Sequence, residues 1–103
     1  MYLYNITYRV ENKIFDSWKL WVLETNIPAI MSLGLFSSFR LCSLLGEENI
    51  DAQTYALQFK CESWETFLKY RDGQMATFFE QQISLFGEDV LTFSSLLEIH
   101  LEG

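Results

Sequence analysis

The amino-acid sequence predicts an α+β fold in which two helices cover one face of a four-stranded antiparallel sheet. Apolar and polar residues alternate in four separate segments, which is the pattern of a strand with one buried face. Between the first two segments, and again between the last two, apolar residues recur three or four positions apart, as in an amphipathic helix. A length of 103 residues is typical of one domain, so residues 1–103 are expected to share one core.

The alternating segments are short and are separated by polar or glycine-containing breaks. The first of them, YLYNITYRV, has tyrosine, isoleucine or valine at every second position. The third follows an acidic segment at 46–53, which is polar enough to form a hairpin loop. The four strands are expected at residues 2–10, 35–45, 55–61 and 91–99.

The first helical stripe includes Trp18 and Trp21 and is interrupted by Pro28. Proline has no amide hydrogen and disfavours helical geometry at the residue before it, so a kink or a restart is expected there. Asn26 is placed to cap the restarted turn with its side chain. Gly34 is expected to end the helix in a left-handed conformation.

The second helix is predicted to begin after Ser63, a good N-cap residue, and to end at Gly87. Its apolar stripe consists of Trp64, Phe67, Leu68, Met75, Phe78, Phe79 and Phe86. Gly73 lies near its middle, where glycine costs about 1 kcal/mol relative to alanine. A bend or a short interruption is therefore expected at that position.

The predicted order of strand, helix, strand, strand, helix and strand is the ferredoxin-like β-α-β-β-α-β arrangement. Right-handed crossovers place the first and third strands in the centre of the sheet and the second and fourth at its edges. The more apolar strand faces are expected to meet the helices, with Tyr4, Ile6, Tyr8, Phe39, Leu41, Tyr55, Leu57, Phe59, Leu91, Phe93 and Leu97. The opposite face is expected to carry Asn5, Thr7, Arg9, Ser38, Arg40, Cys42, Ala56, Gln58, Lys60, Thr92, Ser94 and Leu96.

Short motifs in these elements resemble one known family. They are YNIT in the first strand, W-x-x-W and then NIP in the first helix, GLFSSFRL at the second strand, TYALQF in the third and FSSLL in the fourth. They are similar to the small bacterial proteins grouped as domain of unknown function 4286, which are placed with the dimeric α+β barrels. The resemblance implies a homodimer whose two sheets pack face to face, and it implies no established activity. Members often carry histidine where this chain has Asn26, which weakens any acid–base role at that position.

Composition restricts the partners. A formal charge of −7 disfavours binding to nucleic acid or to an anionic membrane. The sequence starts without the pattern of a signal peptide and contains no apolar run of 18 residues, so a cytoplasmic protein is expected. Half of the residues are hydrophobic and 17% are aromatic, more than a small core needs, which favours a homodimer that packs through the open sheet face.

Basic and amide side chains on the open face form the candidate ligand site, which consists of Asn5, Arg9, Arg40, Gln58 and Lys60. Three of the seven basic residues gather there in a strongly acidic chain. One interpretation is a pocket for a small anionic or carbonyl ligand. The alternative is that these groups pair with Glu98 or with acids across a dimer.

Other reactive side chains have simpler interpretations. His100 is the only histidine and has no neighbouring ligand residues, and Cys42 and Cys61 are expected to be buried hydrophobes rather than a disulfide or a metal pair. Glu47 and Glu48 are expected to be solvated. The aromatic residues of the helices are expected to belong to the core, with an apolar cavity as the alternative: Trp18, Trp21, Trp64, Phe67, Phe78 and Phe79.

No spacing in the sequence matches a metal site, a phosphate loop or a nucleophile with its base, so no metal, cofactor or catalytic residue is expected. A binding or interaction protein is therefore the favoured interpretation. The alternative is a cofactor-independent enzyme, similar to a monooxygenase or an isomerase, with a small-molecule pocket between the sheet and the helices.

Overall fold

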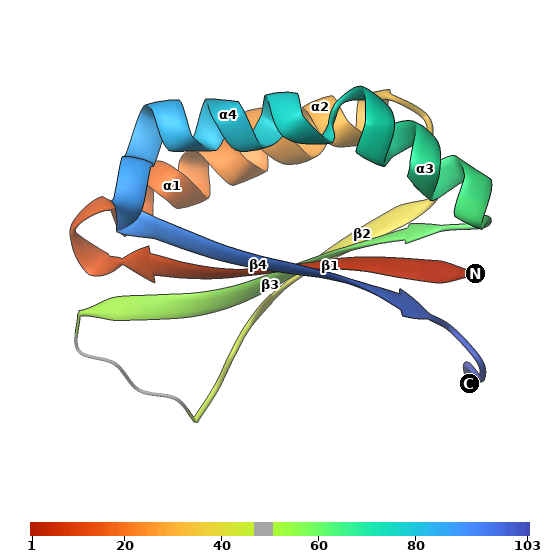
Figure 1. Ribbon diagram of the computed structural model, residues 1–103. Helices are drawn as coiled ribbons and strands as arrows, with labels where there is room; N and C mark the ends of the chain where they lie inside the picture. The colour runs from red at the N-terminus through yellow and green to blue at the C-terminus, as the bar shows by residue number, and fades with distance from the viewer. Residues whose placement is uncertain (47–50) are drawn as a thin grey trace.

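The protein, as a computed structural model, has a helical layer on one face of a four-stranded sheet (Figure 1). The structure describes residues 1–46 and 51–103. The strands are β1 (Tyr2–Glu11), β2 (Ser38–Ser43), β3 (Ala52–Cys61) and β4 (Val90–Glu98). The helical segments are η1 (Asn12–Ile14), α1 (Phe15–Trp21), η2 (Val22–Asn26), α2 (Ile27–Ser32), α3 (Trp64–Gly73), α4 (Met75–Phe86) and η3 (Gly87–Asp89).

The strand order in the sheet is β2-β3-β1-β4, and every neighbouring pair is antiparallel. The two central strands, β1 and β3, are those that right-handed crossovers place there. Ile6 of β1 lies opposite Leu57 of β3 on one side and opposite Ser94 of β4 on the other. Directly opposed residues point to the same face of a sheet, so this register decides which side chains share a face.

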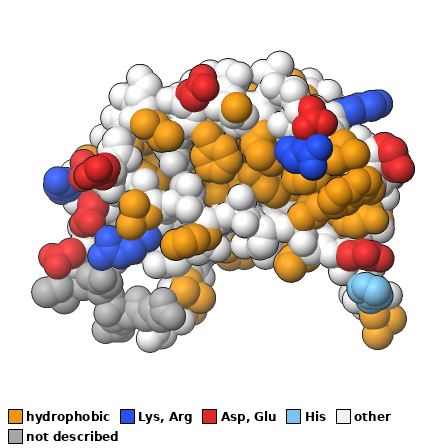
Figure 2. Space-filling model, in the orientation of Figure 1, with side chains coloured by type: hydrophobic (Ala, Val, Ile, Leu, Met, Phe, Trp, Pro, Cys, Tyr) orange, Lys and Arg blue, Asp and Glu red, His pale blue; other side chains and the backbone are white. Residues whose placement is uncertain are grey.

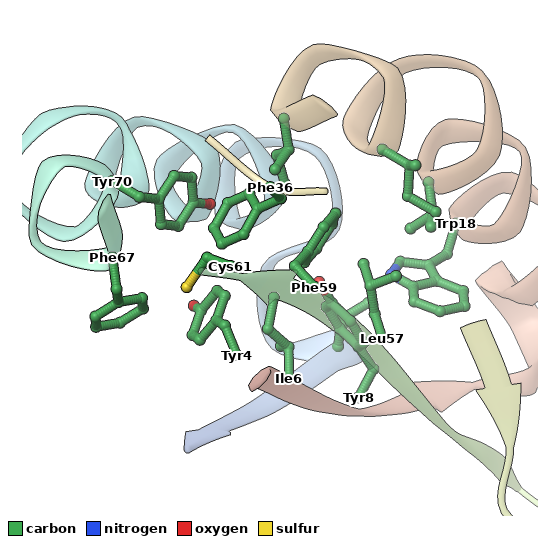
Figure 3. Close-up of a cluster of buried hydrophobic side chains, with 14 of the residues drawn as sticks. Tyr4, Ile6, Tyr8, Trp18, Phe36, Leu57, Phe59, Cys61, Phe67 and Tyr70 are labelled. Carbon is green, nitrogen blue, oxygen red and sulfur yellow. The ribbon is translucent and has the colours of Figure 1, made fainter. Parts of the chain in front are cut away.

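Aromatic side chains dominate the core between the two layers. Tyr8 packs against Trp18 with a ring-centroid distance of 5.1 Å, and Phe36 packs against Tyr70 at the same distance. Figure 3 shows these side chains lying between β1 and β3 on one side and the helices on the other. Each such pair contributes about 0.5–1.5 kcal/mol beyond the burial of its area.

The first helix changes geometry before Pro28 instead of stopping. Residues Val22–Asn26 form a π-helical turn in which the Ile27 amide donates to the Val22 carbonyl, five residues earlier. This wider turn makes room for the proline ring, which clashes with the preceding turn of a regular α-helix. The expected cap by Asn26 is wrong, because its side chain makes no capping bond and is 97% buried.

The second helix follows the sequence prediction closely. The Ser63 hydroxyl accepts a hydrogen bond from the Thr66 amide at 3.1 Å. The helix is interrupted after Gly73, and α4 ends at Gly87, whose φ of 55° suits glycine. Gly34, with φ of 73°, ends the first helical segment as expected. Glu47 and Glu48, which are expected to be solvated, lie outside the described residues.

The expected facing of the fourth strand is wrong by one residue. Leu91, Phe93 and Leu97 lie opposite Arg9, Thr7 and Leu3, so they belong to the open face of the sheet. Conversely, Thr92, Ser94 and Leu96 face the helices. Leucine occurs on both faces of β4. The sequence pattern therefore did not show which alternate positions face the helices and which face the open side of the sheet.

Candidate functional site

Three predicted site residues form a row across the open face. The register places Asn5 of β1 opposite Gln58 of β3, and Gln58 opposite Arg40 of β2. Nε and Nη2 of Arg40 donate to Oε1 of Gln58 at 3.1 and 2.8 Å, and Nε2 of Gln58 donates to Oδ1 of Asn5 at 3.2 Å. The amide of Gln58 therefore holds the Arg40 guanidinium in place.

Lys60 lies beside this row and binds a carboxylate. Its Nζ is 2.6 Å from Oε1 of Glu102, and this ammonium group lowers the pKa of the Glu102 carboxyl. The C-terminal segment thus reaches from β4 to a residue of β3 on the open face, and it forms part of the wall of a hollow of about 420 Å³. The hollow is lined by Leu3, Ser38, Phe39, Arg40, Gln58, Lys60, Ile99, Leu101 and Glu102.

Arg9 does not join this group. It lies four residues farther along β1 than Asn5, opposite Thr54 and Leu91, and its Nη1 is 3.0 Å from Oε1 of Glu11. Arg9 and Lys60 therefore pair with Glu11 and Glu102 of the same chain, and not with Glu98, the acid that the alternative interpretation named. The acceptor of Arg40 is an amide, and the expected acid, Glu98, lies 3.8 Å from His100 instead.

An apolar row on the open face was missed by sequence reasoning. Exposed fractions are 49% for Leu91, 74% for Phe93 and 48% for Leu97, and these residues project from β4 beside the polar row. Large apolar side chains gathered on one face often mark a contact surface. The signal was present in the sequence, but the wrong phase of β4 assigned these residues to the core.

A second group of polar side chains is buried between the sheet and the helices. Asn26 of η2 and Gln82 of α4 are 3% and 4% exposed, and they line a cavity together with Tyr4, Tyr8 and Tyr70. Oδ1 of Asn26 and Oη of Tyr4 are buried without a hydrogen-bond partner. Burial raises the pKa of Tyr4 to about 12 and also raises the pKa of Tyr8 and Tyr70, so the three hydroxyls are neutral.

Aromatic and apolar side chains complete the wall of this cavity: Ile6, Trp21, Ile30, Met75, Phe78 and Phe79. Three of them belong to the aromatic set for which a cavity was the alternative interpretation. The burial of Gln82 could have been predicted from its position in the apolar stripe of the helix, four residues after Phe78 and four before Phe86. Asn26 was missed because the following proline favoured a cap.

One side of the cavity lies at the edge of the sheet. Ser94 of β4 faces the helical layer by its register and is nevertheless exposed, so the helices leave this edge of the sheet uncovered. Figure 2 shows hydrophobic side chains gathered along the side of the molecule, between the helical layer and the sheet. At this edge the Ser94 hydroxyl lies near that of Tyr4, which is one of the residues that line the cavity.

The remaining reactive residues are dispersed. Cys61 is buried, which raises the pKa of its thiol, whereas Cys42 is exposed on the open face, so the expected burial of Cys42 is wrong; both thiols are free. His100 is exposed near the end of the chain. Across residues 1–46 and 51–103 there is no group of three potential metal ligands. No helix in the same part of the chain has the length and hydropathy of a membrane span.

Comparison with known proteins identifies a family and a fold. The family model described as "Domain of unknown function (DUF4286)" matches residues 1–100. A dimeric ferredoxin-like protein from an uncultured marine organism has a TM-score of 0.77 at 9% identity, with 99% of this chain and 98% of that chain covered. HapK from Hahella chejuensis has a TM-score of 0.68 at 12% identity, with coverages of 100% and 96%. No curated protein matches the sequence.

Proposed function

We propose a function for this chain, which belongs to the DUF4286 family of unknown function. It is a homodimeric binding module whose subunits pack through their open sheet faces. The observation that carries this proposal is the apolar row of β4. Phe93 alone leaves 74% of its surface exposed, beside Leu91 and Leu97 on the same face. Burying apolar surface of this kind in a contact stabilises the association by about 25 cal/mol for each Å² that is removed from contact with water.

A second copy is the partner that fits this face best. The helices cover the other face of the sheet, so a twofold axis through the open face brings two equivalent patches together without moving any helix (Figure 1). The similar protein from an uncultured marine organism is described as dimeric and is covered over 98% of its length. This similarity supports the same assembly for the present chain.

Size-exclusion chromatography with light scattering tests the assembly at micromolar concentration. We expect the mass of two chains for the wild type and of one chain for Phe93→Asp, because an aspartate at this position places a charge in the apolar contact. The variant is expected to keep the circular dichroism spectrum of the wild type. A monomeric wild type, or a dimeric Phe93→Asp, would contradict the proposal.

The hollow beside Lys60 is proposed to bind a small anion. The Glu102 carboxylate, 2.6 Å from Nζ of Lys60, already occupies the position of such a group. The Arg40 guanidinium lines the same hollow and is held by Gln58, with its other donors free for a ligand. A ligand carboxylate or phosphate would replace that of Glu102 at Lys60 and extend toward Arg40.

Thermal unfolding with added phosphate or acetate tests the anion site. We expect either anion to raise the unfolding temperature of the wild type and to have a smaller effect on Arg40→Ala. Arg9→Ala is the matched control, because it removes the same positive charge from the same sheet face outside the hollow. Equal shifts in the two variants would show general screening of charge instead of a site.

A further inference from the structure

We infer that the cavity between the sheet and the helices binds a flat, uncharged small molecule that carries one hydrogen-bond donor and one acceptor. This site lies on the opposite side of the sheet from the dimer face and from the hollow beside Lys60. It is therefore independent of the proposed assembly. The evidence consists of two unpaired polar atoms, an uncharged wall and an uncovered edge.

The unpaired atoms determine the hydrogen bonds of the ligand. Oδ1 of Asn26 is an acceptor without a donor, in a side chain that is 97% buried. Oη of Tyr4 has no partner of good hydrogen-bond geometry either, in a residue that is 98% buried, although the Ser94 hydroxyl at the uncovered edge lies near enough to lower its pKa. Buried polar groups are almost always paired, because an unpaired one costs about 1–3 kcal/mol. A ligand N–H or O–H would satisfy Asn26, and a ligand carbonyl would accept from Tyr4.

The wall of the cavity determines the charge and the shape of the ligand. Every residue that lines the cavity is uncharged: tyrosine, tryptophan, phenylalanine, isoleucine, methionine, asparagine and glutamine. An ion in such a place would lose its hydration without gaining a counter-charge, so a neutral molecule is favoured. Trp21, Phe78 and Phe79 present ring surfaces, which suit a flat ligand.

The free space determines how the ligand enters. The free volume of the whole cavity is only about 10 Å³, which is the room that one water molecule needs. A larger ligand must therefore displace side chains. Met75 and Phe79 are only partly buried, and methionine adapts easily because three of its bonds rotate. The uncovered side near Ser94 leaves room for this rearrangement without a change in the sheet.

Neutral and charged probes test this site. Benzamide and 2-pyridone are flat and neutral and carry both a donor and an acceptor, whereas benzoate is charged and toluene has no polar group. We expect benzamide or 2-pyridone to raise the unfolding temperature of the wild type and to shift the amide NMR signals of Asn26 and Gln82. Benzoate lacks the donor and toluene lacks both polar groups, so each is expected to bind at least about tenfold more weakly, because the loss of one hydrogen bond alone has about this effect.

Two variants separate binding at this site from binding elsewhere. Asn26→Leu removes the acceptor, and Tyr4→Phe removes one hydroxyl; each should weaken binding of the neutral probes about tenfold. Tyr2→Phe is the matched control, because Tyr2 is on the same strand but packs against Trp64, away from the cavity. Unchanged affinity in both cavity variants would overturn the inference. Failure of both neutral probes to bind the wild type would do so as well, and would leave a site for water alone.

Discussion

Asn26 is the residue whose position in the fold differs most from its expected role. Its neighbour Pro28 suggested a helix cap, but the π-helical turn carries its side chain into the protein. There its Oδ1 has no partner, although Gln82 and three tyrosines line the same cavity. A buried amide oxygen without a partner reduces the stability of the folded protein, so its presence calls for an explanation other than packing.

Substituting Asn26 by leucine, which has nearly the same shape, is expected to stabilise the ligand-free protein. The change removes the cost of an unpaired buried acceptor, about 1–3 kcal/mol. For a domain of this size, each kcal/mol corresponds to a rise of about 4–8 °C in the unfolding temperature. Calorimetry measures the effect. Asn26→Asp is the control and should destabilise the protein at neutral pH, because it buries a charge without a counter-ion. A lower unfolding temperature for Asn26→Leu would show that the amide is satisfied.

The strand β4 shows how one element determines the character of a whole surface. Val90 is buried at its start, and the register with β1 then sends Leu91, Phe93 and Leu97 to the open face. The same register places the small residues Thr92 and Ser94 on the face of the sheet that the helices pack against. One phase of alternation therefore creates both the apolar row on the open face, where the dimer contact is proposed, and the uncovered edge of the cavity.

Two leucines with similar exposure test the phase of β4. Leu97, on the open face, is 48% exposed, and Leu23, in η2 of the helical layer, is 47% exposed. We expect Leu97→Asp to weaken the dimer, so that light scattering shows dissociation at a higher protein concentration than for the wild type. Leu23→Asp should leave the dimer intact. The opposite result would place the contact surface on the helical layer.

The whole molecule holds neutral tyrosines in its core, and this makes its stability sensitive to alkaline pH. Burial raises the pKa of Tyr4 from 10.0 to about 12 and raises the pKa of Tyr8 and Tyr70 as well. Above pH 10 the unfolded chain releases these protons while the folded chain keeps them, so alkaline conditions favour unfolding. The stability that Tyr4 contributes is fully present below pH 10 and is lost as the pH rises through about 12.

We expect the free energy of unfolding to fall by about 1.4 kcal/mol per pH unit for each of these tyrosines above pH 10. Urea unfolding at several pH values measures the slope, and absorbance at 295 nm follows ionisation. Tyr70→Phe should reduce the slope by the contribution of one proton. Ionisation of all three tyrosines before any loss of circular dichroism would contradict this prediction.

Much of this architecture was predictable, because it depends on local patterns. The alternation in β1 and β3, the Ser63 cap, the interruption at Gly73 and the ends at Gly34 and Gly87 each follow from a few neighbouring residues. The candidate site was predictable in part. Asn5, Arg40, Gln58 and Lys60 come together because the facing of β1, β2 and β3 was correct.

Two features depended on long-range pairing that local patterns do not encode. The phase of β4 is set by its hydrogen bonds to β1, some 90 residues earlier, and not by its own composition, which has leucine on both faces. The burial of Asn26 depends on a π-helical turn and on α4 packing across it. Local periodicity thus determined the elements, whereas the pairing of distant segments decided which polar atoms are buried and which apolar ones are exposed.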